Sequence, residues 1–197
     1  MTVLHLVQHA EKKREPGDPG LTELGRRQAA ATAEWARQAG VRALFSSPLR
    51  RARETAQPIA FRTGLLVRED VRLRERMNWD GDQSIEEFLA QWATAVRDRD
   101  FVTSSGESSR DIGERMRACL AELAGLAGSA GQPGPVAVVT HGGATVDLLR
   151  TLIGDRAVPA ELMDQGVPSC AITTLDQLSV VEIASVSYLT SLPPSTA

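Results

Sequence analysis

The sequence predicts an α/β fold built on a mostly parallel β-sheet. Two apolar runs, at residues 3–8 and 136–140, are rich in Val and Leu, and each leads directly into a histidine. Runs of this length and composition are typical of strands buried on both faces of a parallel sheet. Strand and helix patterns alternate along most of the chain. Two consecutive strand patterns near its end add antiparallel content at one side of the sheet.

The elements of the first third are predicted from the residues at their ends. After the first strand, Thr22 is an N-cap that opens a helix running to about residue 38. Residues 43–46 form a second short strand. A second helix starts with Pro48 at its first position and is closed by Gly64. Residues 65–67 follow as a candidate third strand.

The middle of the chain is predicted to leave the sheet. Residues 69–106 are an excursion that is irregular at first and then helical, because Ser84-x-x-Glu87 is a capping box for a helix ending near Arg99. Ser108 or Ser109 caps a long helix, and the Gly/Pro-rich residues 128–135 connect it to the strand at 136–140.

The last quarter contains one clear helix and a pair of strands. The helix runs from about 144 to 153, and residues 159–163 form one more helical turn. Residues 170–175 and 178–183 are predicted as strands joined at Asp176-Gln177, and residues 193–197 as a frayed tail.

Length and composition indicate an ordinary globular protein. A chain of 197 residues can build one sizeable core, so residues 1–197 are predicted to form a single domain. No run approaches the roughly 18–20 apolar residues that span a membrane, and no secretory signal is visible. Neither of the two cysteines belongs to a C-x-x-C pair. We therefore expect a cytoplasmic location, with both thiols reduced.

The charge is unevenly distributed along the chain. The net charge of −3 argues against nucleic acid as the main partner. Residues 1–76 contain 15 Lys or Arg against 9 Asp or Glu, whereas the remaining residues contain 7 against 16. This asymmetry has two interpretations: solvated helix faces, or a basic pocket in the first third that attracts an anionic substrate.

Side chains in the sequence can fill four roles in phosphoryl transfer. His9 and His141 follow strands whose carboxyl ends are the usual place for a ligand in such a sheet. A neutral imidazole is a good nucleophile, and a second imidazole can stabilise the transferring charge. Arginine, here Arg50 or Arg51, grips phosphoryl oxygens in bidentate fashion. A carboxyl group, Glu75 or Glu11, is needed to protonate the leaving alcohol.

Six short motifs follow one another over residues 3–143. They are Leu6-Val7-Gln8-His9-Ala10-Glu11; Leu21-Thr22 with Gly25 and Gln28-Ala29; Ser47-Pro48-Leu49-Arg50-Arg51-Ala52; Leu73-Arg74-Glu75 with Trp79-Asp80-Gly81; Gly106-Glu107-Ser108; and Val139-Thr140-His141-Gly142-Gly143. In this order they resemble the histidine phosphatase superfamily, the phosphoglycerate-mutase-like proteins. Each motif alone is weak evidence, and the conserved order of the family makes the set specific.

The resemblance implies a three-layer α/β/α sandwich and hydrolysis of a phosphomonoester through a phosphohistidine on His9. It assigns Arg51, rather than Arg50, and His141 to the phosphoryl oxygens, and Glu75 to general acid and then base catalysis. Gln8, Thr22 and Gly142 are further phosphate-binding candidates. The excursion at 69–106 would cover the active site.

The resemblance also implies the partners. The expected ligand is a small phosphorylated substrate or inorganic phosphate, with no metal, other cofactor, nucleic acid or membrane. A metal site formed by His9, Glu11 and His141 has no paired-ligand spacing to support it. The oligomeric state cannot be inferred from the sequence.

The nucleophile motif departs from the family pattern. Gln8 occupies the position of an arginine, and Ala10 that of a glycine. Glutamine donates hydrogen bonds but has neither a charge nor a guanidinium fork. A nearby cation could replace the arginine, and the candidates are Lys12, Lys13, Arg14 and Arg50. Alternatively, the protein binds phosphorylated ligands with weak or no turnover. A phosphoglycerate-type mutase is a third interpretation, ranked lower because the excursion is short.

Overall fold

The computed structural model describes residues 2–129 and 134–189. Among these residues, one mixed sheet contains six strands in the order β3-β2-β4-β1-β5-β6. The strands are β1 (Val3–Gln8), β2 (Ala43–Ser46), β3 (Val67–Glu69), β4 (Val136–Thr140), β5 (Ile172–Asp176) and β6 (Ser179–Ser185). Strands β3, β2, β4 and β1 are parallel, and β5 and β6 are antiparallel at one side. The predicted fold class, mostly parallel with some antiparallel content, is confirmed.

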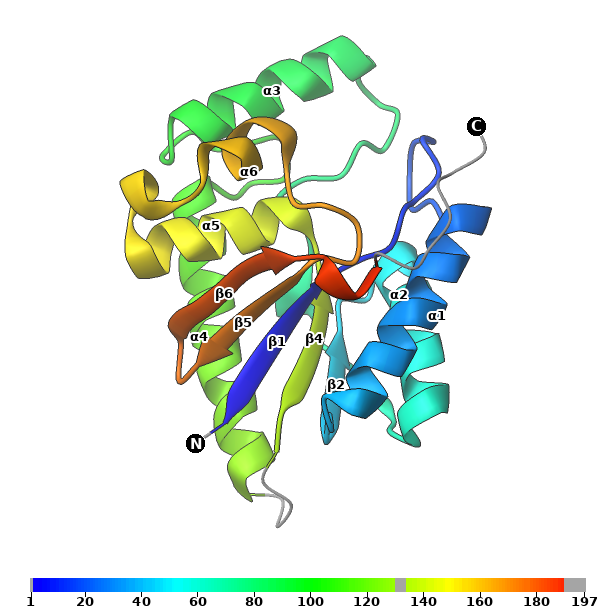
Figure 1. Ribbon diagram of the computed structural model, residues 1–197. Coiled ribbons are helices and arrows are strands. Elements are labelled where there is room, and N and C mark those ends of the chain that lie inside the picture. Colours follow the sequence, from blue (N-terminus) through cyan, green and yellow to red (C-terminus); the bar gives the residue numbers. More distant parts are fainter. Residues whose placement is uncertain (1, 130–133, 190–197) are drawn as a thin grey trace.

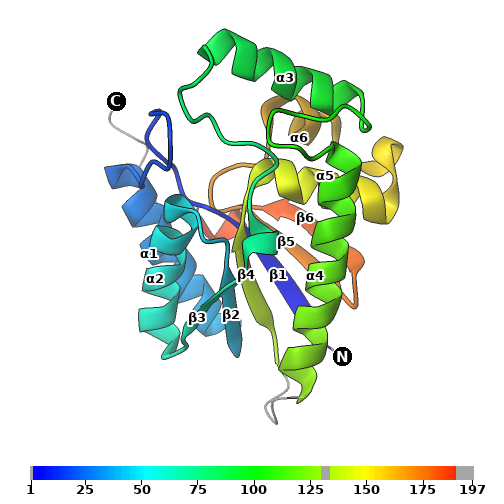
Figure 2. The same cartoon turned by 180° about the vertical axis from the view of Figure 1, so that it is seen from behind.

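Helices cover both faces of the sheet (Figures 1 and 2). The helices are α1 (Glu23–Gln38), α2 (Arg50–Thr63), α3 (Ile85–Arg97), α4 (Ser109–Ser129), α5 (Gly142–Ile153) and α6 (Ala160–Gln165), with 3₁₀ turns η1 (Val71–Leu73), η2 (Asp155–Ala157) and η3 (Ser187–Leu189). One face packs against α1 and α2, and the other against α4 and α5. Helix α3 stands apart from both layers, beyond the carboxyl ends of the parallel strands.

Two apolar cores lie on the two faces of the sheet. Successive strand residues point to opposite faces, so Leu6 of β1 packs in the core under α4 and α5, and Val7 in the core under α1 and α2. In β4, Val138 likewise packs in the core under α4 and α5, and Val139 in the core under α1 and α2. The continuous apolar runs in the sequence are therefore explained by burial on both sides. The three-layer prediction is confirmed.

The strand register determines where the two histidines leave the sheet. Strands β1 and β4 are parallel neighbours, and Gln8 pairs with Thr140, the last residue of each strand. The residues that follow, His9 and His141, therefore emerge side by side at one edge of the sheet. Strand β2 lies on the other side of β4, where the amide of Ser47 donates to the carbonyl of Val139.

Several predicted boundaries shift. Helix α2 starts at Arg50, so Pro48 precedes the helix instead of opening it, and the N-cap Leu49 keeps an extended backbone. Strand β3 begins at Val67, two residues later than predicted. Helix α5 begins two residues early, at Gly142, because a carboxylate from the excursion accepts its first amide hydrogens, as described below.

The turn between β5 and β6 lies at Gln177-Leu178, one residue beyond the prediction. Asp176 pairs with Ser179 across it, and both turn residues have positive φ, 47° and 66°. This is the backbone of a two-residue hairpin turn whose twist matches the strands, although neither residue is the usual Asn or Gly. The sequence therefore carried no turn signal at this point.

Two predicted segments lie partly or wholly outside the described residues: the connector at 128–135, of which 130–133 are not described, and the tail at 193–197. Among the residues that are described, no helix has both the length and the apolar character needed to cross a bilayer.

Candidate active site

The rings of His9 and His141 lie together at the carboxyl edge of the sheet. Their centroids are 5.3 Å apart and their planes are inclined by 60°. Both side chains are buried, and the ring of His141 is completely covered. The Nε2 atom of His141 lies 2.7 Å from the hydroxyl of Ser47, while its Nδ1 atom has no hydrogen-bond partner among the described residues.

The tautomer of His9 is determined by its own backbone. Its Nδ1 atom lies 2.8 Å from the carbonyl oxygen of Ala10. A carbonyl oxygen only accepts, so Nδ1 must carry the proton and Nε2 must carry the lone pair. The amide of Ala10 in turn donates to the hydroxyl of Thr55 on α2, which holds the loop in place. This arrangement leaves Nε2 as the nucleophilic atom.

Burial keeps both imidazoles neutral. Burial first, and then the nearby positive charge of Arg51, lower the pKa of His9 to about 3. The pKa of His141 is also held well below its usual value, first by burial and then by Arg51. A lowered histidine pKa means that the neutral form predominates above it. His9 is therefore unprotonated at neutral pH, the state that a nucleophile needs.

We expect NMR titration to show this directly, since the chain contains only three histidines. The ring signals of His9 and His141 should not titrate between about pH 5 and 8, whereas in denaturant all three should titrate near the usual value of about 6.5. A ring of His9 in the folded protein that titrates like a free imidazole would contradict the neutral, buried site.

Arg51 is the cation that acts most strongly on the pKa values of both rings. It projects from the first turn of α2, and only 3% of its surface is exposed. Its Nη1 atom donates to Asn78 at 3.2 Å and lies 3.8 Å from a carboxylate oxygen of Asp18, while its Nε has no hydrogen-bond partner in the described part of the chain. A buried guanidinium is seldom left with so few acceptors, so this position is suited to an anion. The adjacent Arg50 is on the surface, paired with Glu54.

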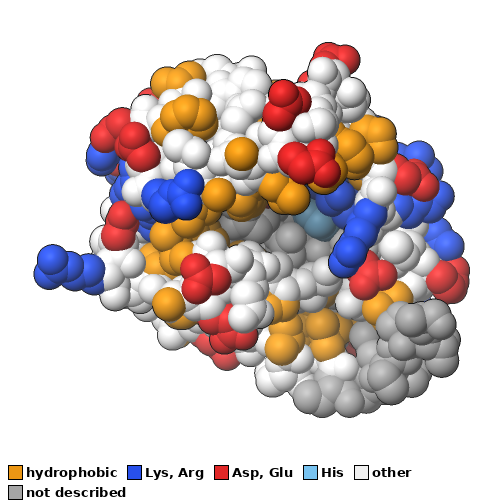
Figure 3. Space-filling view, turned by 90° about the horizontal axis from the view of Figure 1, so that it is seen from above, with side chains coloured by type: hydrophobic (Ala, Val, Ile, Leu, Met, Phe, Trp, Pro, Cys, Tyr) orange, Lys and Arg blue, Asp and Glu red, His pale blue; other side chains and the backbone are white. Residues whose placement is uncertain are grey.

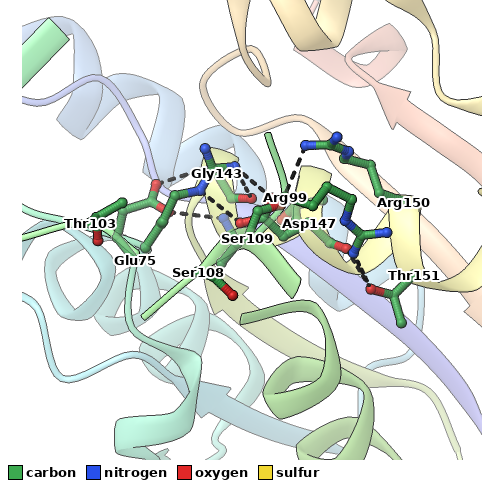
Figure 4. Close-up of polar contacts among 12 residues, drawn as sticks. Glu75, Arg99, Thr103, Ser108, Ser109, Gly143, Asp147, Arg150 and Thr151 are labelled. Carbon is green, nitrogen blue, oxygen red and sulfur yellow. Dashed lines mark hydrogen bonds and ion pairs between the residues drawn. The ribbon is translucent and has the colours of Figure 1, made fainter. Parts of the chain in front are cut away.

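Glu75 forms the link between the excursion and α5 (Figure 4). Its Oε1 accepts hydrogen bonds from the amides of Arg76 at 2.8 Å and Ala144 at 2.9 Å, and its Oε2 from the amide of Gly143 at 3.1 Å. A carboxylate at a helix N-terminus is stabilised by the helix dipole. The fit needs glycine, because a Cβ on Gly143 would lie 2.6 Å from Glu75 and 2.7 Å from Trp92.

A cavity of about 620 Å³ opens in front of these groups. Figure 3 shows the hollow from above, with hydrophobic side chains along its border and basic side chains beside a histidine at one side. Its polar lining residues come from the loop between β1 and α1, from α2 and from the excursion at residues 69–106. The lining residues are His9, Lys12, Arg14, Glu15, Gly17, Pro19, Arg51, Glu75, Met77, Asn78, Trp79, Ile85, Phe88, Leu89 and Trp92.

Of the predicted site residues, His9, Arg51 and Glu75 line this cavity. His141 adjoins His9 but is covered. Gln8 is buried against Gly142: a Cβ added to Gly142 would lie 3.6 Å from the side-chain nitrogen Nε2 of Gln8. The Oε1 atom of Gln8 has no hydrogen-bond partner among the described residues. Neither His141 nor Gln8 lines the cavity.

Thr22 lies outside the cavity lining as well. Its hydroxyl caps α1 by accepting from the amide of Gly25 and donates to the carboxylate of Glu11 at 2.7 Å. Glu11 is thereby held against α1 and does not join the histidines. No group of three or more His, Cys, Asp or Glu side chains in the described part of the chain is arranged to hold a metal ion.

Sequence reasoning missed a buried ion pair that supports the site. Arg76 makes two hydrogen bonds to Asp147 of α5, at 2.6 and 2.7 Å, and both side chains are buried. Its guanidinium also lies 4.9 Å from the ring centre of Trp92. Burial, partly offset by the charge of Arg76, raises the pKa of Asp147 to about 6. The pair ties Glu75, α5 and α3 together, and no local pattern in the sequence signals it.

A comparison with protein-family models decides the family. Residues 4–179 match the model described as the histidine phosphatase superfamily, branch 1. The chain belongs to this superfamily. The resemblance in the six motifs is thereby confirmed, and so is the phosphoglycerate-mutase-like fold, because solved members superpose on this chain.

Three similar proteins illustrate the range of the superfamily. A glucosyl-3-phosphoglycerate phosphatase of Mycobacterium tuberculosis is 37% identical over 148 residues, which span 69% of this chain and 65% of that protein. A protein of Yersinia pestis named a probable phosphoglycerate mutase is 35% identical over 78% of this chain and 76% of its own length. The structure of a mycobacterial glucosyl-3-phosphoglycerate phosphatase with inorganic phosphate has a TM-score of 0.70 and 31% identity, covering 90% of this chain and 92% of that one.

Proposed function

We propose that this member of the histidine phosphatase superfamily hydrolyses a phosphomonoester through a phosphohistidine on His9. The observation that carries the proposal is the pairing of a neutral imidazole, whose Nε2 bears the lone pair, with the under-coordinated guanidinium of Arg51 in one cavity. The small phosphorylated substrate or inorganic phosphate expected from the sequence agrees with the phosphate complex of the mycobacterial relative.

In the first step, Nε2 of His9 attacks the phosphorus in line with the leaving oxygen. The P–N bond forms as the P–O bond breaks, and Glu75 gives its proton to the leaving alcohol. In the second step, Glu75 takes a proton from water, whose oxygen attacks the phosphorus, and the P–N bond breaks to regenerate His9 and release phosphate. Arg51 stabilises the negative charge of the transferring group, and the neutral ring of His141 lies beside that of His9. Positioning and electrostatics supply most of the catalysis in such reactions.

The lone pairs of the Glu75 carboxylate are directed at backbone amides of α5. These bonds fix the position of the carboxylate at the wall of the cavity that His9 and Arg51 also line. They also occupy the amides of Gly143 and Ala144, so those two donors are not available to a phosphate. The positive charge for the phosphoryl oxygens has to come from side chains.

Lys12 and Arg14 are the cations best placed to compensate for Gln8. Both line the cavity, whereas Lys13 and Arg50 do not. Lys12 is half-buried, and its pKa is lowered first by burial and then by the positive charge of Arg51. Two cations held close together in this way gain most from an anion placed between them. This supports an active phosphatase despite the glutamine.

Two other functions are compatible with the superfamily. A phosphate-binding module would explain Gln8 and would bind phosphate without forming the covalent intermediate. A phosphoglycerate-type mutase has support from the name of the Yersinia relative. We rank both below the phosphatase, since the cavity keeps a nucleophile, an acid and cations together.

Trapping the covalent intermediate tests the proposal. Wild-type protein quenched during turnover of 4-nitrophenyl phosphate should carry one phosphoryl group on His9, acid-labile and alkali-stable, detectable by mass spectrometry of the peptide. Phosphate binding by calorimetry without any such adduct or turnover would favour the binding module. Interconversion of phosphoglycerates faster than phosphate release would favour the mutase.

A further inference from the structure

The lining of the cavity combines two chemically different sets of side chains. His9, Arg51 and Glu75 form the set where a phosphoryl group would react. The second set, which we call the apolar end, comes from the excursion. Its hydrophobic residues are Met77, Trp79, Ile85, Phe88, Leu89 and Trp92. This apolar end is not explained by the chemistry of phosphate.

Helix α3 presents its apolar face to the cavity instead of to a core. Ile85, Phe88, Leu89 and Trp92 recur at i, i+3, i+4 and i+7, the spacing of one helix face, and all four line the cavity. Yet Ala95 is the one buried residue recorded for α3, and Leu89 is 56% exposed. An amphipathic helix normally buries such a face against its own protein. Here the face is left for something that enters the cavity.

The polar groups near this end already have partners. The amide nitrogen of Asn78 donates to the carbonyl of Gly17, and its oxygen accepts from Arg51. The indole nitrogen of Trp79 donates to the carbonyl of Gln83. A leaving group with many hydroxyls would lose its hydrogen bonds to water here and gain few in return. A hydrocarbon group would lose no hydrogen bonds and would bury apolar surface.

We propose that the site selects phosphomonoesters whose alcohol part is an apolar group, aromatic or bulky aliphatic, seated against α3. The proposal rests on the phosphatase function proposed above and narrows its substrate class. It sets this chain apart from the relatives whose names specify a glucosyl-glycerate ester.

The test compares two esters of primary alcohols, so that the leaving groups differ in polarity and not in the type of oxygen that departs. We expect kcat/KM for 2-phenylethyl phosphate to exceed that for glycerol 3-phosphate by about tenfold or more, the scale of discrimination that an apolar pocket provides. Leu89→Ser should reduce this preference several-fold, mainly through KM for the phenylethyl ester.

Leu126→Ser is the matched control. Leu126 is a leucine of similar exposure, 50%, on α4, and it does not line the cavity. This variant should keep the wild-type preference. An equal effect of the two variants, or equal turnover of the two esters by the wild type, would overturn the apolar specificity while leaving the phosphatase function intact.

A binding measurement separates failure of the specificity from failure of the function. Calorimetry compares the affinities of two non-hydrolysable probes, 2-phenylethylphosphonate and methylphosphonate. The difference between these affinities measures the contribution of the apolar end to binding without any catalysis. Tighter binding of the phenylethyl probe supports the apolar specificity even if neither ester is turned over, a result that would by itself defeat the phosphatase proposal. Equal binding of the two probes overturns the specificity.

Discussion

Replacing His9 by alanine should abolish turnover of every phosphomonoester, with a loss on the order of 10⁴-fold or more, because the substitution removes the atom that forms the P–N bond. The ring of His9 is buried and its Nδ1 is pinned, so no other group of the described residues stands in the same position with a free lone pair. His141 cannot substitute, since its Nε2 is engaged by Ser47 and it does not line the cavity.

Steady-state kinetics with 4-nitrophenyl phosphate measure this loss, and mass spectrometry should find no phosphoryl adduct on the variant. Inorganic phosphate should still bind to His9→Ala, because Arg51 and Lys12 remain. His5→Ala is the matched control. His5 lies in β1 against Trp35 and outside the cavity, so its variant should keep activity. Residual turnover of His9→Ala within tenfold of the wild type would refute the phosphohistidine mechanism.

Replacing Arg51 by methionine should lower kcat/KM by about 10²–10³-fold, the usual cost of removing one preorganised donor from a developing anion. The protein itself should not be destabilised. Arg51 is a buried cation, and its one ion pair among the described residues, with Asp18, spans 3.8 Å. Methionine, an apolar residue of similar length, would remove this incompletely compensated buried charge. Activity and thermal stability should therefore change independently, the melting temperature being kept or raised.

Arg50→Met is the control for this prediction. Arg50 is the preceding residue of the same helix, but it is exposed and paired with Glu54. The variant should keep wild-type kcat/KM. If Arg50→Met lost as much activity as Arg51→Met, the cation at the cavity would not be the one that the geometry indicates, and general charge attraction would explain both effects.

The strands and the order of the motifs could be predicted because they depend on local chemistry. The apolar runs before His9 and His141 are readable as strands, since burial on both faces favours Val and Leu at most positions. The capping box at Ser84 and Glu87 is present in the structure, with both of its hydrogen bonds. The choice of Arg51 over Arg50 agrees with its place in the cavity, a distinction that rested on the family pattern and not on the residues alone.

Other features of the site depend on contacts between distant segments. Thr22 caps α1, as its local pattern predicted, but its hydroxyl also donates to Glu11, which lies eleven residues earlier in the chain. The early start of α5 depends on Glu75, which lies more than sixty residues earlier in the chain. The ion pair of Arg76 and Asp147 has the same origin. None of these contacts leaves a periodic or local pattern.

The sequence by itself determined the class of fold, the superfamily and the chemical parts of the site, because strand burial, helix caps and short motifs are properties of neighbouring residues. The tertiary structure decided which of those parts share a cavity, that Lys12 and Arg14 of the loop after His9 line it, and that α3 turns an apolar face toward it. These outcomes depend on strand register and on long-range hydrogen bonds, which form only when the chain has folded.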